Sequence, residues 1–135
     1  ARECSAFGIH VGNSDMPPSQ IAMQWPNCGL LGYSLEYITQ LQSLEMQYAD
    51  YLGVSPVFST PTKTDTVTQW GLEGIAKIRS LTNKPLVAIG AMNTHNAYDV
   101  IKAGADCIAV VSAISQAENP AKAAWEIRNE IERAL

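Results

Sequence analysis

Five short apolar runs recur along the chain, and each has the length of a β-strand. The runs are nearly continuous in apolar residues instead of alternating with polar ones, which is typical of strands buried on both faces of a parallel sheet. Such strands are predicted over residues 8–12, 30–34, 51–55, 86–90 and 107–112.

Helical patterns separate these runs. The clearest covers residues 72–81, where apolar residues return about every 3.6 positions, the period of an amphipathic helix. The first six residues have the pattern of the last turn of a helix, and Pro120 stands where proline favours a helix start. Further helices are predicted over residues 38–48, 96–103 and 121–135.

The strand and helix patterns alternate, so right-handed β-α-β crossovers are expected. This order fits either a doubly wound sheet or a (β/α)8 barrel of the TIM type. An internal repeat favours the barrel, because an Ala-Asp pair leads into the strand at both residues 49–51 and 105–107. A complete barrel usually needs about 200 residues or more. We therefore interpret residues 1–135 as a single α/β domain, either the C-terminal part of a barrel or a half-barrel that needs a partner.

Composition narrows the class of partner. The chain is 47% apolar and 16% charged, with a net charge of −4, so it can form a core but has no general basic surface for nucleic acid or an anionic membrane. Its three cysteines, Cys4, Cys28 and Cys107, form no C-x-x-C motif; we expect reduced thiols, buried as small apolar side chains. No apolar run approaches the roughly 18 residues of a membrane span, and a cytoplasmic location is expected.

Polar segments follow three of the predicted strands. Residues 59–65 carry hydroxyl groups and Lys63, and residues 89–92 and 110–114 follow two later strands. Because parallel strands of a barrel end at the same rim, these segments are expected to lie close together. Backbone amides, hydroxyls and a lysine ammonium all bind phosphate well. The sequence therefore predicts a phosphate-handling α/β protein.

Several phrases together resemble the thiamine-phosphate synthase family, also called thiamine-phosphate pyrophosphorylase. The Pro-Thr-Lys phrase at residues 61–63 is the specific signal, and the others are weak when taken singly. The resemblance extends over essentially the whole chain, and it implies that the five strands are the fourth to the eighth of the family's barrel. The matching segments are residues 8–15, 31–34, 53–63, 71–75 and 110–114.

The resemblance implies a transferase of thiamine biosynthesis. In that family a Mg²⁺-assisted reaction joins hydroxymethylpyrimidine diphosphate to hydroxyethylthiazole phosphate and yields thiamine phosphate and pyrophosphate. A carbon–oxygen bond to the diphosphate breaks while cationic character grows on the pyrimidine methylene. The catalyst must therefore stabilise the departing pyrophosphate by electrostatics and hold the thiazole nitrogen in line.

The same resemblance assigns roles to residues of this chain. Asp15 is implied as the Mg²⁺ ligand, and Ser34 and Lys63 as the catalytic residues that contact the diphosphate. Thr60 and Thr62, with Pro61 between them, would line the thiazole phosphate pocket. Backbone amides would bind the phosphate itself at Gly90, Ala91, Val111 and Ser112. The implied partners are small-molecule substrates.

Two positions depart from the family pattern. Glu36 stands where the family usually has a histidine two residues after the serine, and Ala91 stands where it usually has a second glycine. The Ala91 methyl would crowd a phosphate, and alanine disfavours a positive φ. His10 is expected to pack inside the barrel, and His95 has no nearby ligand pattern for zinc.

Two other readings stay open. A thiazole tautomerase, a relative of the synthases, would be expected to carry the histidine that Glu36 replaces. A half-barrel that binds a phosphate ligand without catalysis, as a truncated or split subunit, is the second. Five parallel units leave unpaired edge strands, so self-association or pairing with a missing N-terminal barrel half is expected.

Overall fold

The structure is a computed structural model that describes residues 1–59 and 69–135. All five predicted strands are present, and each pairs in parallel with the next one along the chain. A doubly wound sheet reverses its strand order at a switch point, whereas this order runs without reversal. The strands are β1 Gly8–Val11, β2 Leu30–Leu35, β3 Tyr51–Val54, β4 Leu86–Ile89 and β5 Cys107–Ala109.

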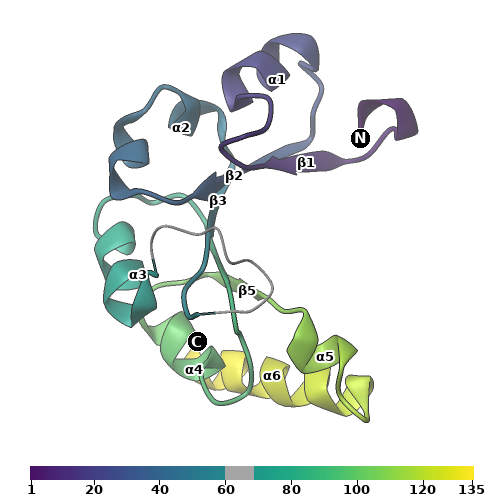
Figure 1. The fold of residues 1–135 in the computed structure, drawn as a ribbon, viewed down its shortest axis with the longest axis vertical. Helices are drawn as coiled ribbons and strands as arrows, with labels where there is room; N and C mark the ends of the chain where they lie inside the picture. The colour runs from purple at the N-terminus through teal and green to yellow at the C-terminus, as the bar shows by residue number, and fades with distance from the viewer. Residues whose placement is uncertain (60–68) are drawn as a thin grey trace.

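Helices cover one side of this sheet. Figure 1 shows α1, α2, α3, α4 and α6 following one another around the outer side of a curved sheet, as in part of a barrel. The α-helices are α1 Pro18–Gln24, α2 Glu45–Tyr48, α3 Gly71–Arg79, α4 Ala97–Lys102, α5 Ser112–Ser115 and α6 Pro120–Ala134. The 3-10 helices are η1 Arg2–Cys4 and η2 Ile38–Gln42.

The helix predictions were correct in part. The single helix predicted over residues 38–48 is wrong, because the chain is extended at Ser43 and forms η2 and α2 on either side of it. Glu45 at the start of α2 accepts hydrogen bonds from both the backbone N–H and the hydroxyl of Ser19, at 2.7 and 2.8 Å. This contact to α1, which the apolar pattern missed, ties α2 to a neighbouring helix.

The core lies between the sheet and the helices. Side chains that alternate along the strands, such as Leu35, Leu52 and Leu86, are fully buried there against Ile75 and Ile78 of α3. The opposite, concave face carries the other half of the strand residues and is open in the described part of the chain. Leu30 on that face is 41% exposed, whereas Gly32 and Gly53 on the same face are buried, so the expectation of burial on both faces is met only in part.

Equivalent aspartates mark the repeated unit. Asp50, directly before β3, accepts a hydrogen bond from the N–H of Leu31 at 2.7 Å, and its own N–H donates to the Leu31 carbonyl. Asp106, directly before β5, makes the same pair of contacts with Leu86, at 2.8 and 2.9 Å. The Ala-Asp repeat of the sequence therefore has a structural basis in the way each aspartate binds the start of the preceding strand.

The cysteine expectation is corrected by the structure. Cys4, Cys28 and Cys107 are free thiols, but Cys4 and Cys107 are exposed and Cys28 is half-buried. Cys107 lies at the start of β5, an edge strand, on the open concave face. Among the described residues, no helix combines the length and the apolar character that crossing a membrane requires.

Candidate functional site

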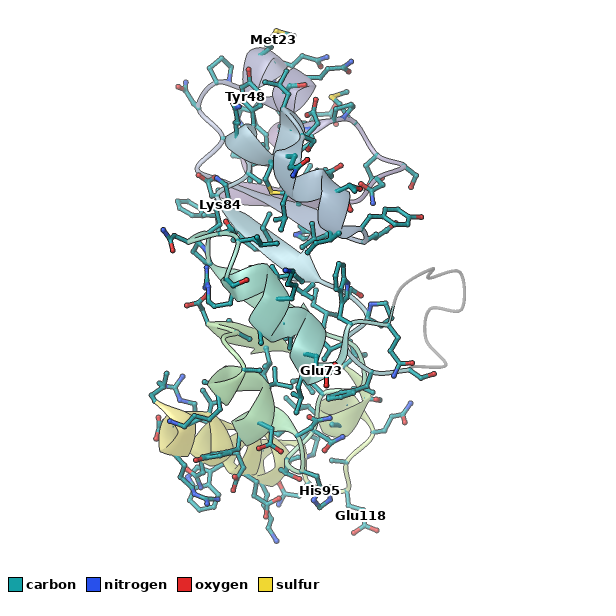
Figure 2. The ribbon with its side chains drawn as sticks, turned by 90° about the vertical axis from the view of Figure 1, so that its left-hand side faces the viewer. Met23, Tyr48, Glu73, Lys84, His95 and Glu118 are labelled. Carbon is teal, nitrogen blue, oxygen red and sulfur yellow. The ribbon has the colours of Figure 1, made fainter. Side chains whose placement is uncertain are left out.

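The candidate residues gather at one rim of the sheet. Asp15 follows β1, Ser34 is near the end of β2, Gly90 follows β4, and Ser112 follows β5. Because all five strands run parallel, their carboxyl ends share this rim, which is where barrels place their binding sites. Figure 2, turned by 90° from Figure 1, shows the elements stacked from Met23 near one end to His95 and Glu118 near the other.

A tight turn after β1 holds Asp15. The Asp15 carboxylate accepts a hydrogen bond from the Gly12 N–H at 2.7 Å, and the Asp15 N–H donates to the Gly12 carbonyl at 3.2 Å. A Cβ built on Gly12 would lie 3.4 Å from the Asp15 carboxylate and 4.0 Å from Ser34 Oγ. The predicted metal ligand and the predicted diphosphate ligand therefore flank the same glycine.

Ser34 belongs to a hydrogen-bonded group on the concave face. Its Oγ lies 3.0 Å from His10 Nε2, and His10 Nδ1 lies 3.1 Å from the Tyr51 hydroxyl. Strand register explains this meeting: His10 pairs with Gly32, and Gly32 pairs with Tyr51. Gly32 has no side chain, and a Cβ there would collide with both rings, so the glycine lets His10 and Tyr51 touch across β2.

The surroundings shift two of these groups. Burial lowers the pKa of His10 below its ordinary value of 6.5, and the negative charge of Asp15 opposes that shift as the smaller effect. Burial raises the pKa of Tyr51 above its ordinary value of 10.0. At neutral pH the imidazole is therefore neutral and the phenol keeps its hydrogen.

Gln40 holds the loop after β2 in place. Its side-chain oxygen accepts hydrogen bonds from the backbone N–H groups of Glu36 and Tyr37, at 2.7 and 2.8 Å. Its side-chain nitrogen donates to Asn13 Oδ1 at 2.7 Å and to the Ser34 carbonyl at 3.1 Å. The Gln40 amide thus joins the loop after β2 to the turn that carries Asp15.

The loop after β4 has an unusual backbone. Gly90 has φ 111° and Ala91 has φ 53°, and the latter is a left-handed conformation that alanine rarely adopts. A Cβ on Gly90 would lie 2.9 Å from Pro56 Cβ, so only glycine fits there. The side-chain amides of Asn93 and Asn96 both donate to the Ala91 carbonyl at 3.0 Å, which fixes the orientation of this strained peptide.

Val111 and Ser112 lie at the other loop of the rim. Val111 precedes α5 and is 66% exposed, and its carbonyl accepts hydrogen bonds from the N–H groups of Ile114 and Ser115. Ser112 is the first residue of α5 and is exposed. Val111 and Ser112 are therefore exposed at the start of the short helix α5, and their role in binding phosphate stays a prediction.

Four predicted residues, Thr60, Pro61, Thr62 and Lys63, lie outside the described residues. The described residues on either side are joined, because the Trp70 N–H donates to the Pro56 carbonyl at 3.0 Å. The Gly71 N–H likewise donates to the Val57 carbonyl at 2.8 Å. The described residues 56–57 and 70–71 thus lie beside each other after the end of β3, at the same rim as Asp15.

The donor set at the rim suits Mg²⁺ only in part. Among residues 1–59 and 69–135, no group of three or more His, Cys, Asp and Glu side chains could hold a metal ion by itself. Asp15 offers hard carboxylate oxygens beside Gly12, and the Ser34 hydroxyl lies near the same glycine. Mg²⁺ typically takes one or two carboxylates and completes its shell with water and substrate phosphate, so this arrangement is compatible with it.

Sequence reasoning missed the polar role of His10 and Tyr51. His10 does lie on the concave face as expected, but it is partly exposed and hydrogen-bonded there instead of packed among apolar side chains. A signal was present in the alternation of the strands. Gly32 and Gly53 share that face with His10 and Tyr51. A glycine beside a large polar side chain on one sheet face leaves room for that side chain to hydrogen-bond across the strand.

Comparison with known sequences identifies the family of this chain. The profile of the family described as thiamine monophosphate synthase matches residues 1–114. The chain belongs to this family. Among curated relatives, a thiamine-phosphate synthase of Albidiferax ferrireducens is 46% identical over 132 residues, which cover 98% of this chain and 60% of that protein. A thiamine-phosphate synthase of Methanococcus maripaludis is 44% identical over 135 residues, covering 100% of the chain and 64% of the relative.

Solved structures agree with the fold. A thiamine phosphate pyrophosphorylase from Pyrococcus furiosus superposes with a TM-score of 0.85 at 39% identity, covering 96% of this chain and 61% of that one. A 3-hexulose-6-phosphate synthase superposes with a TM-score of 0.71 at 22% identity, which shows the fold alone. The chain spans about 60% of the length of the curated relatives that it matches.

Proposed function

We propose that this chain carries most of the catalytic rim of a thiamine-phosphate synthase. The enzyme would transfer the pyrimidine methylene of hydroxymethylpyrimidine diphosphate to hydroxyethylthiazole phosphate, giving thiamine phosphate and pyrophosphate. One observation carries the proposal: in a member of this family, Asp15 and Ser34 flank the same glycine at the carboxyl ends of neighbouring strands.

The chemistry needs charge stabilisation more than proton transfer. The scissile carbon–oxygen bond leaves its electron pair on the pyrophosphate, and the thiazole nitrogen forms the new bond to carbon. Asp15 would hold Mg²⁺, which neutralises charge on the departing phosphate oxygens when it is bound. Ser34 would donate a hydrogen bond to the diphosphate, and the Lys63 ammonium would contact it as a point charge.

The thiazole phosphate would bind at the other loops of the rim. Gly90, Ala91, Val111 and Ser112 would offer backbone N–H groups and a hydroxyl, and Thr60, Pro61 and Thr62 would line the pocket beside them. The two hydrogen bonds to the Ala91 carbonyl support this assignment, because they hold the loop after β4 in one conformation and a preorganised loop loses little entropy when an anion binds. The Ala91 methyl would weaken the site relative to glycine.

The complete catalyst would be a (β/α)8 barrel to which this chain, as a single domain, contributes the last five units. The strand order, the curvature in Figure 1 and the shared length with the relatives support this. The first three units would come from the same polypeptide or from a separate chain. They would cover the open concave face and pair with the edges of β1 and β5.

Pyrophosphate release is the direct test. In the complete protein, Lys63→Ala should lower the rate by about tenfold or more, because a charge-assisted hydrogen bond contributes about 1.5–3 kcal/mol. An unchanged rate would remove the lysine from the mechanism. The mass of the native polypeptide should exceed 14.6 kDa if the missing units belong to the same chain.

The second candidate function is binding of a phosphate ligand without catalysis. A half-barrel that binds a phosphate ligand without catalysis would use the residues after β4 and β5, Gly90, Ala91, Val111 and Ser112. Binding of thiazole phosphate, measured by calorimetry, without release of pyrophosphate from the pyrimidine substrate would support this alternative. Release of pyrophosphate that depends on both substrates would exclude it.

A further inference from the structure

We propose that Tyr51 and His10 form a directional hydrogen-bond chain that aims the hydroxyl hydrogen of Ser34 at an anionic ligand on the rim. Tyr51 and His10 are then positioning residues, and Ser34 is the group that touches the ligand. The inference rests on the proposed function for the identity of that anion, a diphosphate. The geometry of the three hydrogen-bonded side chains does not depend on the identity of the anion.

The three side chains form one continuous path. The Tyr51 hydroxyl lies 3.1 Å from His10 Nδ1, and His10 Nε2 lies 3.0 Å from Ser34 Oγ. The Tyr51 and His10 ring centroids are 5.4 Å apart with the planes inclined by 33°. Both ring nitrogens of His10 are therefore occupied, one on each side of the imidazole.

Two glycines confine the imidazole to this position. A Cβ on Gly53 would lie 2.8 Å from His10 Cε1, and a Cβ on Gly32 would collide with the His10 ring and with Tyr51. The ring thus lies against the bare backbone of β2 and β3. A histidine held this closely has one orientation in which its two nitrogens face Tyr51 and Ser34.

The direction of the two hydrogen bonds follows from counting the donors and acceptors of His10. A neutral imidazole has one N–H donor and one acceptor nitrogen, so the two hydrogen bonds must run in the same sense. When the Tyr51 hydroxyl donates to Nδ1, the Nε2–H donates to Ser34 Oγ and the serine hydrogen stays available. In the reverse sense the serine hydrogen is used on His10, and only oxygen lone pairs face the rim.

Two physical arguments select the first sense. A phenol is a stronger acid than an aliphatic hydroxyl, so Tyr51 is the better donor to the imidazole. An anionic ligand needs a hydrogen from Ser34 and would be repelled by its lone pairs. Both groups are also neutral at neutral pH, as the donor and acceptor counting requires: burial lowers the pKa of His10, with the charge of Asp15 opposing as the smaller effect, and raises the pKa of Tyr51.

The first experiment reads the tautomer without any activity. The chain contains two histidines, so ¹⁵N NMR of the His95→Gln variant reports His10 alone. At neutral pH we expect the tautomer with hydrogen on Nε2, and Tyr51→Phe should shift the population toward hydrogen on Nδ1. Hydrogen on Nδ1 in the parent, or an unchanged tautomer in Tyr51→Phe, would overturn the proposal.

The second experiment measures the effect on an anion. With inorganic pyrophosphate and Mg²⁺ as the probe, Tyr51→Phe should weaken binding by about three- to tenfold, the range of one hydrogen bond. In a Ser34→Ala background the same change should have no further effect. Equal and additive losses in the two backgrounds would contradict the positioning role.

Tyr48→Phe is the matched control. Tyr48 lies on α2, is 41% exposed, and projects from the helix-covered side in Figure 2, so its change should leave pyrophosphate binding unaltered. The two experiments also separate the two proposals. The protein could show the expected tautomer, and its loss in Tyr51→Phe, but bind no pyrophosphate. That result would support the hydrogen bonds between Tyr51, His10 and Ser34 and contradict the proposed function.

Discussion

Asp106 accepts a hydrogen bond from the backbone N–H of Leu86 at 2.8 Å, so the residue before β5 binds the first residue of β4. Arg79 completes the contact by donating to the same carboxylate at 2.9 Å. Asp50 binds Leu31 in the same way at the start of β2. The relationship recurs at β2 and β4 because a backbone N–H near the start of each strand needs an acceptor, and the aspartate before the next strand provides it.

Removal of the Asp106 carboxylate should destabilise the fold. We expect Asp106→Ala to lower the free energy of unfolding by about 1–3 kcal/mol, because the Leu86 N–H loses its acceptor. Asp106→Asn keeps an acceptor oxygen and should lose less. Urea unfolding followed by circular dichroism measures both, and equal losses in the two variants would assign the effect to the Arg79 ion pair instead.

The left-handed backbone at Ala91 predicts a stabilising substitution. Ala91→Gly should raise the free energy of unfolding by about 1 kcal/mol, because glycine adopts a φ of 53° without a steric cost. Ala76→Gly in the exposed middle of α3 is the control and should lower it by about 1 kcal/mol. Changes of the same sign in the two variants would contradict the strain at Ala91.

The same substitution tests the proposed phosphate site. Ala91→Gly removes a methyl group at the loop after β4 and leaves the N–H in place, so thiazole phosphate should bind more tightly. Isothermal titration calorimetry of the two proteins measures the difference. Equal or weaker affinity in the variant would count against crowding by Ala91.

Space over Gly32 is essential to the contact between His10 and Tyr51. Gly32→Ala places a methyl group against both rings and should lower the free energy of unfolding by about 1–3 kcal/mol. The His10 NMR signals should move as well. Gly12→Ala is a milder change, because its Cβ would meet nothing closer than the Asp15 carboxylate at 3.4 Å. An equal loss in both variants would show that the Gly32 site has no special steric constraint.

His10 should make stability depend on pH in one direction. Its pKa is lowered in the folded state, so the folded protein favours the neutral ring. The stability associated with His10 is therefore fully present above pH 6.5 and is lost as the pH falls through the lower folded-state pKa. Urea unfolding between pH 5 and 8 should show a slope that His10→Gln removes and His95→Gln keeps. Persistence of the slope in His10→Gln would assign it to other groups.

Local patterns alone were sufficient for the five strands and for the helices α3, α4 and α6. The five apolar runs predicted β1 to β5, and the amphipathic period predicted α3. Both signals are local, because an element that packs on a core places apolar residues at regular intervals along its own sequence. The short helices α1 and α5 were not predicted, because they contain too few residues to show an apolar period. The break at Ser43 depends on contacts of Gln40 and Glu45 with residues distant in sequence.

The sequence by itself determined the alternation of strands and helices in a repeated α/β protein and placed Asp15, Ser34, Gly90, Ala91, Val111 and Ser112 at strand ends. The tertiary structure decided which of these residues meet. His10, Ser34 and Tyr51 come from three strands, and their contact depends on parallel register and on the missing side chain of Gly32. Register is set by pairing between segments about 20 residues apart in the chain, a distance over which local periodicity carries no information.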